Sequence, residues 1–155
     1  MTTTAPGSVT RPEIRAAERA DLLAIYRIEQ ASFEQPWPFT AFEDYLGEPG
    51  FLVADDSGVV GYVVADTIPS HGRDLGHIKD LAVHDSRRGE GIGTLLLTRA
   101  LSILEAEGVR STKLEVRESN DTAVSLYETH GFEHRRTIPG YYSDGEDALV
   151  LVRGL

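Results

Sequence analysis

The sequence predicts one α/β domain built on a mixed, largely antiparallel sheet of about seven strands, flanked by about four helices. Two observations carry this prediction. The chain has 155 residues, which is the size of a single domain with one hydrophobic core. Its apolar residues switch between strand and helix spacing in the order strand, two helices, three strands, helix, strand, helix and two strands.

The N-terminal part predicts a tail, a strand and a helix. Residues 1–11 are small and polar, so we expect a disordered tail before a domain that spans residues 12–155. Residues 13–17 predict a short strand, and residues 21–33 carry apolar side chains at helical spacing. The Gln-Pro-Trp-Pro segment at residues 35–38 ends this helix, because proline cannot continue it.

A second short helix and a hairpin follow. The helix is predicted over residues 40–46, where Thr40 and Glu43 have the spacing of a capping box. The hairpin joins strands at residues 51–55 and 59–67 through an Asp-Ser-Gly turn.

An apolar strand at residues 78–83 then runs into a glycine-rich turn that opens a helix. Gly89, Gly91 and Gly93 lie at alternate positions, and leucines at helical spacing continue to Gly108, a C-cap glycine. The rest of the chain predicts a strand at 112–116, a helix capped by Ser119 or Asn120 that reaches His130, and strands at 132–138 and 148–152.

Composition excludes several classes of protein. The chain has no cysteine, which rules out disulfides, a thiolate nucleophile and cysteine-ligated metal. Its five histidines lack ligand spacing, so no metal site is predicted. No apolar run approaches the roughly 18 residues of a membrane span, and no secretory signal is present, so we expect no membrane partner and a cytoplasmic protein.

The charge is strongly negative. The net charge is −10, and Lys79 and Lys113 are the only lysines. An acidic surface argues against nucleic-acid binding. Abundant carboxylates with scarce lysine resemble proteins of salt-accumulating, halophilic organisms; an acidic, arginine-preferring proteome is the alternative.

The glycine turn is typical of a phosphate site, because a helix N-terminus offers unpaired N–H groups and glycine lets an anion approach. A turn that only reverses the chain is the structural alternative. A dinucleotide site would need G-x-G-x-x-G, whereas the chain has G-x-G-x-G and lacks the preceding βαβ half, although Glu115 lies near the expected acidic position. A triphosphate P-loop would need Lys-Ser/Thr where Thr94-Leu95 follow.

Three segments resemble the GNAT superfamily of acetyl-CoA-dependent N-acetyltransferases. They are the Leu-Ala-Val strand at 81–83, the Arg-Gly-Glu-Gly-Ile-Gly turn at 88–93, and the run from Leu-Glu-Val-Arg to Gly-Phe at 114–132. The last segment is similar to RimI-type enzymes, which modify the N-terminal alanine of a ribosomal protein. His77 before the strand, and the late Tyr-Tyr pair at 141–142, are also similar to Ard1-type catalytic subunits.

The resemblance implies a single-domain GNAT fold and an acetyl-CoA site. The pyrophosphate would lie on the glycine turn and the pantetheine beside the strand. The residues implied are Leu81, Ala82, Val83, Arg88, Gly89, Glu90, Gly91, Ile92, Gly93, Thr94 and Asn120.

The resemblance also implies the catalytic pair. Glu115 would be the general base that frees the acceptor amine, and Tyr127 the acid that protonates the leaving thiolate. Glu115 could instead pair with Lys113 and Arg117 on one face of its strand, and Tyr127 could be a core residue.

A peptide groove is expected between the loop at 33–39 and the loop at 141–147. Its candidate residues are Glu29, Phe33, Trp37, His77, Tyr141 and Tyr142. His77 could share the role of base or be a packing residue, and Phe33 and Trp37 could simply cover the first helix.

The function implied is acetyl transfer to the N-terminal α-amine of a protein, which the RimI-type likeness extends to a ribosomal protein with N-terminal alanine. An auxiliary subunit is a further expectation from the Ard1-type likeness. The alternatives are acetylation of a small amine, such as a polyamine or an antibiotic, and a non-catalytic acyl-CoA sensor.

Overall fold

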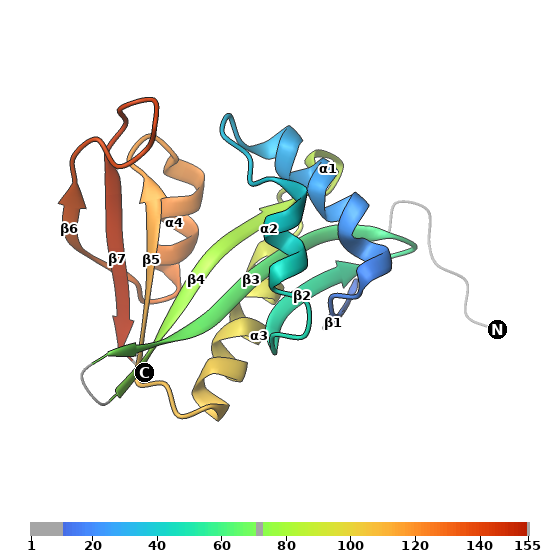
Figure 1. The fold of residues 1–155 in the computed structure, drawn as a ribbon, viewed down its shortest axis with the longest axis horizontal. Helices are drawn as coiled ribbons and strands as arrows, with labels where there is room; N and C mark the ends of the chain where they lie inside the picture. Colours follow the sequence, from blue (N-terminus) through green and yellow to red (C-terminus); the bar gives the residue numbers. More distant parts are fainter. Residues whose placement is uncertain (1–10, 71–72, 155) are drawn as a thin grey trace.

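The strands form one sheet with the order β1-β2-β3-β4-β5-β7-β6 (Figure 1). The computed structural model describes residues 11–70 and 73–154, so most of the predicted tail lies outside the described residues. The strands are β1 (Glu13–Ala16), β2 (Gly50–Asp55), β3 (Val59–Ser70), β4 (Arg73–Val83), β5 (Ser111–Arg117), β6 (Glu133–Ile138) and β7 (Ala148–Gly154). Within the described chain β4 and β5 pair in parallel and the other neighbours are antiparallel, which confirms the predicted fold class.

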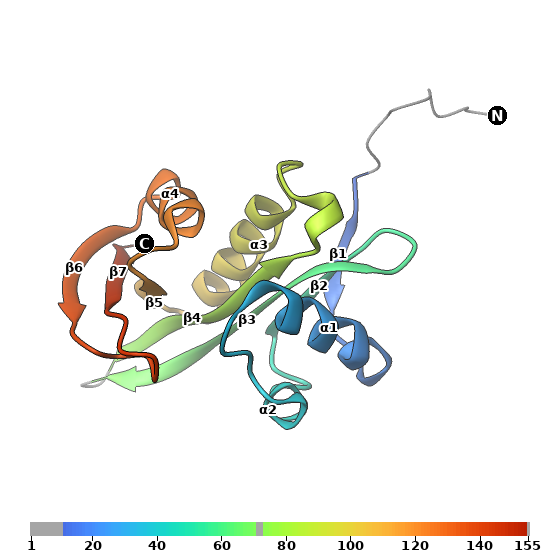
Figure 2. The ribbon, with the colours of Figure 1, turned by 90° about the horizontal axis from the view of Figure 1, so that it is seen from above.

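Helices cover both faces of the sheet. They are α1 (Leu22–Ser32), α2 (Phe39–Asp44), α3 (Ile92–Ala106) and α4 (Asp121–Thr129), with short 3₁₀ turns at Arg19–Asp21 and Asp85–Arg87. Figure 2 shows α1 and α2 on one face and α3 and α4 on the other. In the part of the chain that is described, none of these helices has the length and apolar character needed to span a bilayer.

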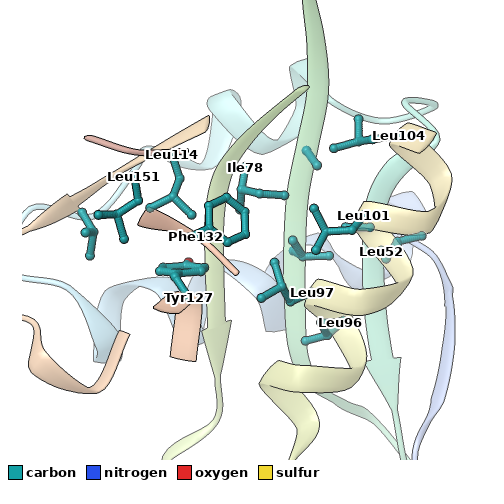
Figure 3. Packing of buried hydrophobic residues seen from close by; sticks show 14 of the residues in the cluster. Leu52, Ile78, Leu96, Leu97, Leu101, Leu104, Leu114, Tyr127, Phe132 and Leu151 are labelled. Carbon is teal, nitrogen blue, oxygen red and sulfur yellow. The ribbon is translucent and has the colours of Figure 1, made fainter. Parts of the chain in front are cut away.

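The two faces of the sheet have separate cores, which follow from the period of two along each strand. In β2, Phe51 and Val53 pack against α1 and α2, whereas Leu52 and Ala54 pack under α3. Figure 3 shows leucines of α3 meeting Ile78 in the core under α3. Each fully buried leucine contributes about 1.5–3 kcal/mol of transfer free energy, so these faces hold the helices in place.

The prediction for the start of the second helix was wrong. Helix α2 begins at Phe39 with Pro38 at the N-cap position, and no side chain of the described residues caps it. Pro38 is extended and cannot continue a helix backward, so it sets the boundary ahead of Thr40. Glu43 does not complete a capping box but forms an ion pair with Arg19 at 3.0 Å. At α4, Asn120 rather than Ser119 is the cap, since its Oδ1 accepts the Ala123 amide at 3.2 Å.

Strands β4 and β5 touch only at one end. Their ladder consists of Gly76 opposite Thr112 and His77 opposite Lys113. A Cβ at Gly76 would lie 2.5 Å from Thr112 Oγ1, so only glycine permits this close approach. Beyond it the strands diverge (Figure 1), which leaves residues 81–83 of β4 without a β5 partner in the described chain. The sheet therefore opens beside the glycine turn.

Candidate functional site

The glycine turn has the backbone geometry of an anion site. Gly89 and Gly91 have φ values of +79° and +83°, which disfavour side chains, and a Cβ at either position would face open space. Gly91 is the N-cap of α3, and its carbonyl accepts the first helical hydrogen bond, from the Leu95 amide. The amides of Ile92, Gly93 and Thr94 lie before Leu95 and have no partner within the helix, so they can bind an anion at the positive end of the helix dipole.

A cavity of about 450 Å³ lies over this turn, in the opening of the sheet; we call it the glycine-turn cavity. It is lined by Ser32, Phe33, Leu81, Ala82, Val83, Arg87, Arg88, Gly89, Gly91, Ile92, Gly93, Thr94, Asn120, Thr122, Ala123, Leu126 and Tyr127. These include every residue that the sequence predicted for acetyl-CoA except Glu90. The Glu90 side chain turns to Arg87, with which it forms an ion pair at 2.8 Å.

Arg88 adds a positive charge to this cavity. Its guanidinium lies 3.3 Å from Ser32 Oγ of α1 and 2.9 Å from Asp85, and about half of its side chain is exposed. A partly exposed arginine beside a helix N-terminus suits a phosphate group. The chemistry of the cavity therefore fits the diphosphate and the extended arm of acetyl-CoA.

A second hollow of about 150 Å³ adjoins the first; we call it the carboxylate groove. It shares Phe33, Leu81, Asn120, Ala123 and Tyr127 with the glycine-turn cavity. Its other lining residues are Glu29, Gln35, Trp37, Ile78, Lys79, Asp80, Glu115, Val116, Arg117 and Tyr142. Tyr127 lies at the boundary of the two spaces, so a group bound in one can meet a group bound in the other there.

Glu115 is held by two basic side chains. Its Oε1 lies 2.7 Å from His77 Nε2, and its Oε2 lies 3.1 Å from Lys113 Nζ. Burial opposes ionisation, but the hydrogen bond from His77 and the charge of Lys113 lower the pKa of Glu115 to about 2. His77 does not line the groove, and its buried Nδ1 has no hydrogen-bond partner in the described chain.

Tyr127 combines a packing role with a position in the site. Its ring meets Phe132 edge to face at 5.7 Å in the core under α4 (Figure 3). Burial, and next the charge of Asp80, raise the pKa of Tyr127. The phenol therefore stays protonated at neutral pH, as a proton donor must.

Two neighbouring carboxylates, buried Glu29 and partly buried Asp80, line the carboxylate groove. Glu29 accepts the Trp37 amide at 2.8 Å and the Tyr62 hydroxyl, which also lies 3.4 Å from Asp80 Oδ2. Asp80 Oδ1 accepts the Leu81 amide at 2.9 Å. Burial, and next the Glu29 carboxylate, raise the pKa of Asp80 well above its ordinary value. Asp80 and Tyr62 were not predicted as site residues; the available signal was a carboxylate inside the apolar strand at 78–83.

Aromatic rings form one wall of the groove. Phe33 and Trp37 line it, and Trp37 also stacks on Tyr45, the C-cap residue of α2, at 5.8 Å. Tyr142 lines the groove, whereas Tyr141 is exposed and contacts the Tyr142 ring at 5.0 Å without lining it. Four of the six predicted peptide-groove residues thus line the groove, and His77 and Tyr141 do not.

Arg117, which the sequence did not mark as a site residue, joins the two sides of the groove. Its Nη1 lies 2.8 Å from both Asp144 and Glu146 of the β6–β7 loop, and its Nη2 donates to Gln35 at 3.1 Å. Its guanidinium also lies 4.1 Å from the Tyr142 ring centroid. One side chain therefore ties the loop after α1 to the loop between β6 and β7.

Known proteins with this sequence pattern have the same fold. The model of the acetyltransferase (GNAT) family matches residues 22–132. An N-alpha-acetyltransferase of Sulfolobus acidocaldarius is 36% identical, with 92% of each chain covered. The [ribosomal protein bS18]-alanine N-acetyltransferase of Escherichia coli is 32% identical, with 89% of this chain and 94% of the enzyme covered. The crystal structure of Ard1 from Thermoplasma volcanium has a TM-score of 0.87 at 30% identity and covers 94% of this chain and 99% of that one.

These matches confirm the resemblance inferred from the glycine turn and from the segment at 114–132. They agree with the mixed sheet and with the use of acetyl-CoA as acetyl donor. The chain belongs to the acetyltransferase (GNAT) family.

Proposed function

We propose that this enzyme transfers the acetyl group of acetyl-CoA to the α-amine at the N-terminus of a protein. The observation that carries this proposal is the meeting of the two spaces at Tyr127. The cavity suited to an acetyl donor opens there into a groove with carboxylate and aromatic walls. The Sulfolobus acidocaldarius relative is an N-alpha-acetyltransferase, which supports a protein α-amine as the acceptor. The Escherichia coli relative is a [ribosomal protein bS18]-alanine N-acetyltransferase, which supports a ribosomal protein with N-terminal alanine as the substrate.

The glycine turn would hold the acetyl donor. Its diphosphate would accept hydrogen bonds from the amides of Ile92 to Thr94 and the charge of Arg88, and its arm would lie along residues 81–83. The thioester would then lie near Tyr127, between the donor cavity and the groove.

Two side chains would serve the chemistry. Glu115, held by His77 and Lys113, would accept a proton from the acceptor nitrogen, directly or through a water. Tyr127 would give its phenolic proton to the thiolate that leaves as the C–S bond breaks. The aromatic wall of Phe33, Trp37 and Tyr142 would flank the first residues of the acceptor.

The test is acetyl transfer in high salt, followed by mass spectrometry. Peptides that begin with Ala, Ser, Thr, Met-Leu and Met-Glu would compete with spermidine as acceptors. We expect acetylation at the peptide α-amine, with the preferred first residue defining the substrate. Acetylation of spermidine alone would replace this proposal with a small-amine acetyltransferase. Binding of acetyl-CoA without any transfer would indicate an auxiliary subunit or a sensor.

The acidic composition also supports a proposal about the cell compartment and the salt concentration in which the enzyme works. A cytoplasmic location in a salt-accumulating cell would suit the net charge of −10, because at molar salt the Debye length falls to about 3 Å and screens self-repulsion. Thermal unfolding between 0.1 and 3 M KCl checks this. A melting temperature that does not rise with salt would contradict it.

A further inference from the structure

We propose that Asp80 takes the first of the two protons that the acceptor nitrogen must lose, and that Glu115 takes the second. This assignment rests on the proposed function and deepens it. An α-ammonium must first become an amine, and the nitrogen of the tetrahedral adduct must then lose one more proton. Both carboxyl groups, those of Asp80 and Glu115, line the carboxylate groove in which the acceptor would bind.

A bulge in strand β4 aims Asp80 into the groove. Asp80 pairs with Val64 and Ile78 with Ala65, so Lys79 is the extra residue between them. Without the bulge Ile78 and Asp80 would share one face of the sheet. With it, Ile78 packs in the core under α3, while Asp80 lies on the opposite face with Tyr62 and Glu29.

The surroundings of Asp80 suit a group that holds and releases a proton. The ionisable side chains that face it or line the groove with it are Glu29 of α1, Tyr62 of β3, Lys79 of β4, Glu115 and Arg117 of β5, Tyr127 of α4 and Tyr142 of the β6–β7 loop. Two neighbouring carboxylates in a partly desolvated site cannot both ionise at low cost, so Asp80 keeps a proton to higher pH than an ordinary aspartate.

The pKa values of Asp80 and Glu115 suit two proton donors of different acidity, the α-ammonium and the nitrogen of the tetrahedral adduct. The α-ammonium has a pKa of about 8, so it transfers a proton well only to a base of raised pKa. The adduct nitrogen is far more acidic, so Glu115, with its pKa of about 2, is basic enough for it. Neighbouring groups whose pKa values are pushed apart are the expected pattern for separate proton-transfer roles.

The steps balance as follows. An N–H bond of the ammonium breaks, its electron pair stays on nitrogen, and the proton goes to an Asp80 carboxylate oxygen. The amine forms the N–C bond to the thioester carbon while the π pair of the carbonyl moves to its oxygen, and Glu115 takes the second proton from nitrogen. That pair then re-forms the carbonyl as the C–S bond breaks, and the thiolate takes a proton from Tyr127. Asp80 and Glu115 release their protons to water in the groove, from which Tyr127 regains its own, so one proton is released in each cycle.

The test compares two acceptor peptides that differ only in the basicity of the amine. One begins with alanine and the other with trifluoroalanine, whose amine is already neutral at pH 7. We expect Asp80→Asn to lower kcat/KM for the alanine peptide by about 100-fold or more and to affect the fluorinated peptide at least ten times less. Glu115→Gln should impair both peptides alike. Equal impairment of both peptides by Asp80→Asn would overturn the assignment.

Controls separate this assignment from folding and from the proposed function. Asp74→Asn changes an exposed aspartate on the same strand and should leave both peptides unaffected. The circular dichroism spectrum and the Kd for acetyl-CoA should be the same in Asp80→Asn as in the wild type, because the amide keeps the size of the carboxyl group. If Asp80→Asn misfolds, Glu29→Gln serves in its place and should impair the alanine peptide more than the fluorinated one.

A wild type that acetylates only spermidine would overturn the proposed function. Asp80→Asn would then be compared with Glu115→Gln on spermidine, and a smaller loss for Asp80→Asn would overturn the assignment too.

Discussion

The glycine-turn cavity takes most of its walls from one continuous segment, residues 81–94, whereas the carboxylate groove takes its walls from α1, β4, β5, α4 and two loops. The first presents mainly backbone and small side chains around a helix N-terminus. The second presents ionisable and aromatic side chains that meet only after folding. A local backbone motif suits a donor that is always the same molecule, and a composite groove can vary with the acceptor.

The comparison also separates what each region contributes to catalysis. Amides at a helix N-terminus bind an anion without titrating near neutral pH, so donor binding should depend weakly on pH. The groove holds Asp80 with a raised pKa and Glu115 with a lowered one, so the pH dependence of turnover should arise there. Variants in the two regions should therefore alter different measured quantities.

The largest effect is expected in the glycine-turn cavity. Gly91→Glu places a negative side chain where the diphosphate would bind, at a φ of +83° that disfavours side chains. We expect the affinity for acetyl-CoA, measured by calorimetry, to fall by more than about 100-fold, or about 2.7 kcal/mol.

The matched control is Gly47→Glu, at a φ of +92° in the loop after α2 and outside the lining of both spaces. It should keep the wild-type affinity. Undiminished binding by a folded Gly91→Glu protein would place the donor elsewhere.

The next largest effect is expected for Glu115→Gln. Loss of the carboxylate should lower kcat by about 100-fold while the Kd for acetyl-CoA stays within twofold. Since its pKa is about 2, Glu115 stays ionised from about pH 4 upward, and the loss should be uniform from pH 5 to 9. A pH-rate profile of kcat measures this, and wild-type turnover would remove Glu115 from the mechanism.

A smaller effect is expected for the arginine that joins the two loops. Arg117→Ala removes two partly buried ion pairs and the contact with Tyr142, together worth about 1–2 kcal/mol. The KM for the peptide should rise about tenfold with little change in the Kd for acetyl-CoA. Arg19→Ala, which breaks an exposed pair with Glu43, is the control. An equal rise in both constants would show that the loops are not specific to the acceptor.

The smallest effect is expected on stability. Asp80 has a pKa of about 3.9 in the unfolded chain and a higher pKa in the folded protein. Between these two pKa values the folded state binds more protons than the unfolded state, so the folded protein loses stability as the pH rises through that interval. Relative to Asp80→Asn, the wild type should lose unfolding free energy as the pH rises above about 3.9, the pKa of an ordinary aspartate. Urea titrations measure this, and parallel curves would exclude a protonated Asp80.

The sequence predicted the glycine-turn cavity better than the carboxylate groove. Every predicted donor residue except Glu90 lines its cavity, because a strand, a turn and a helix in succession position those residues over a short stretch of chain. Glu90 is absent from the lining because its side chain forms an ion pair with Arg87, three residues before it. In the groove, His77 and Tyr141 lie outside the lining, and Asp80, Tyr62 and Arg117 were missed.

The sequence by itself determined the fold class and the family, and it predicted the residues that line the glycine-turn cavity, since strand and helix periods and the glycine spacing are local properties of the chain. Only the tertiary structure decided how the charged groups pair. This pairing depends on the bulge at Lys79, which turns Asp80 toward Glu29, and on the short β4–β5 ladder, which brings His77 to Glu115. Those two contacts join residues that are 51 and 38 positions apart in the chain. The pKa values of these groups follow from burial and from neighbours that no single stretch of sequence contains.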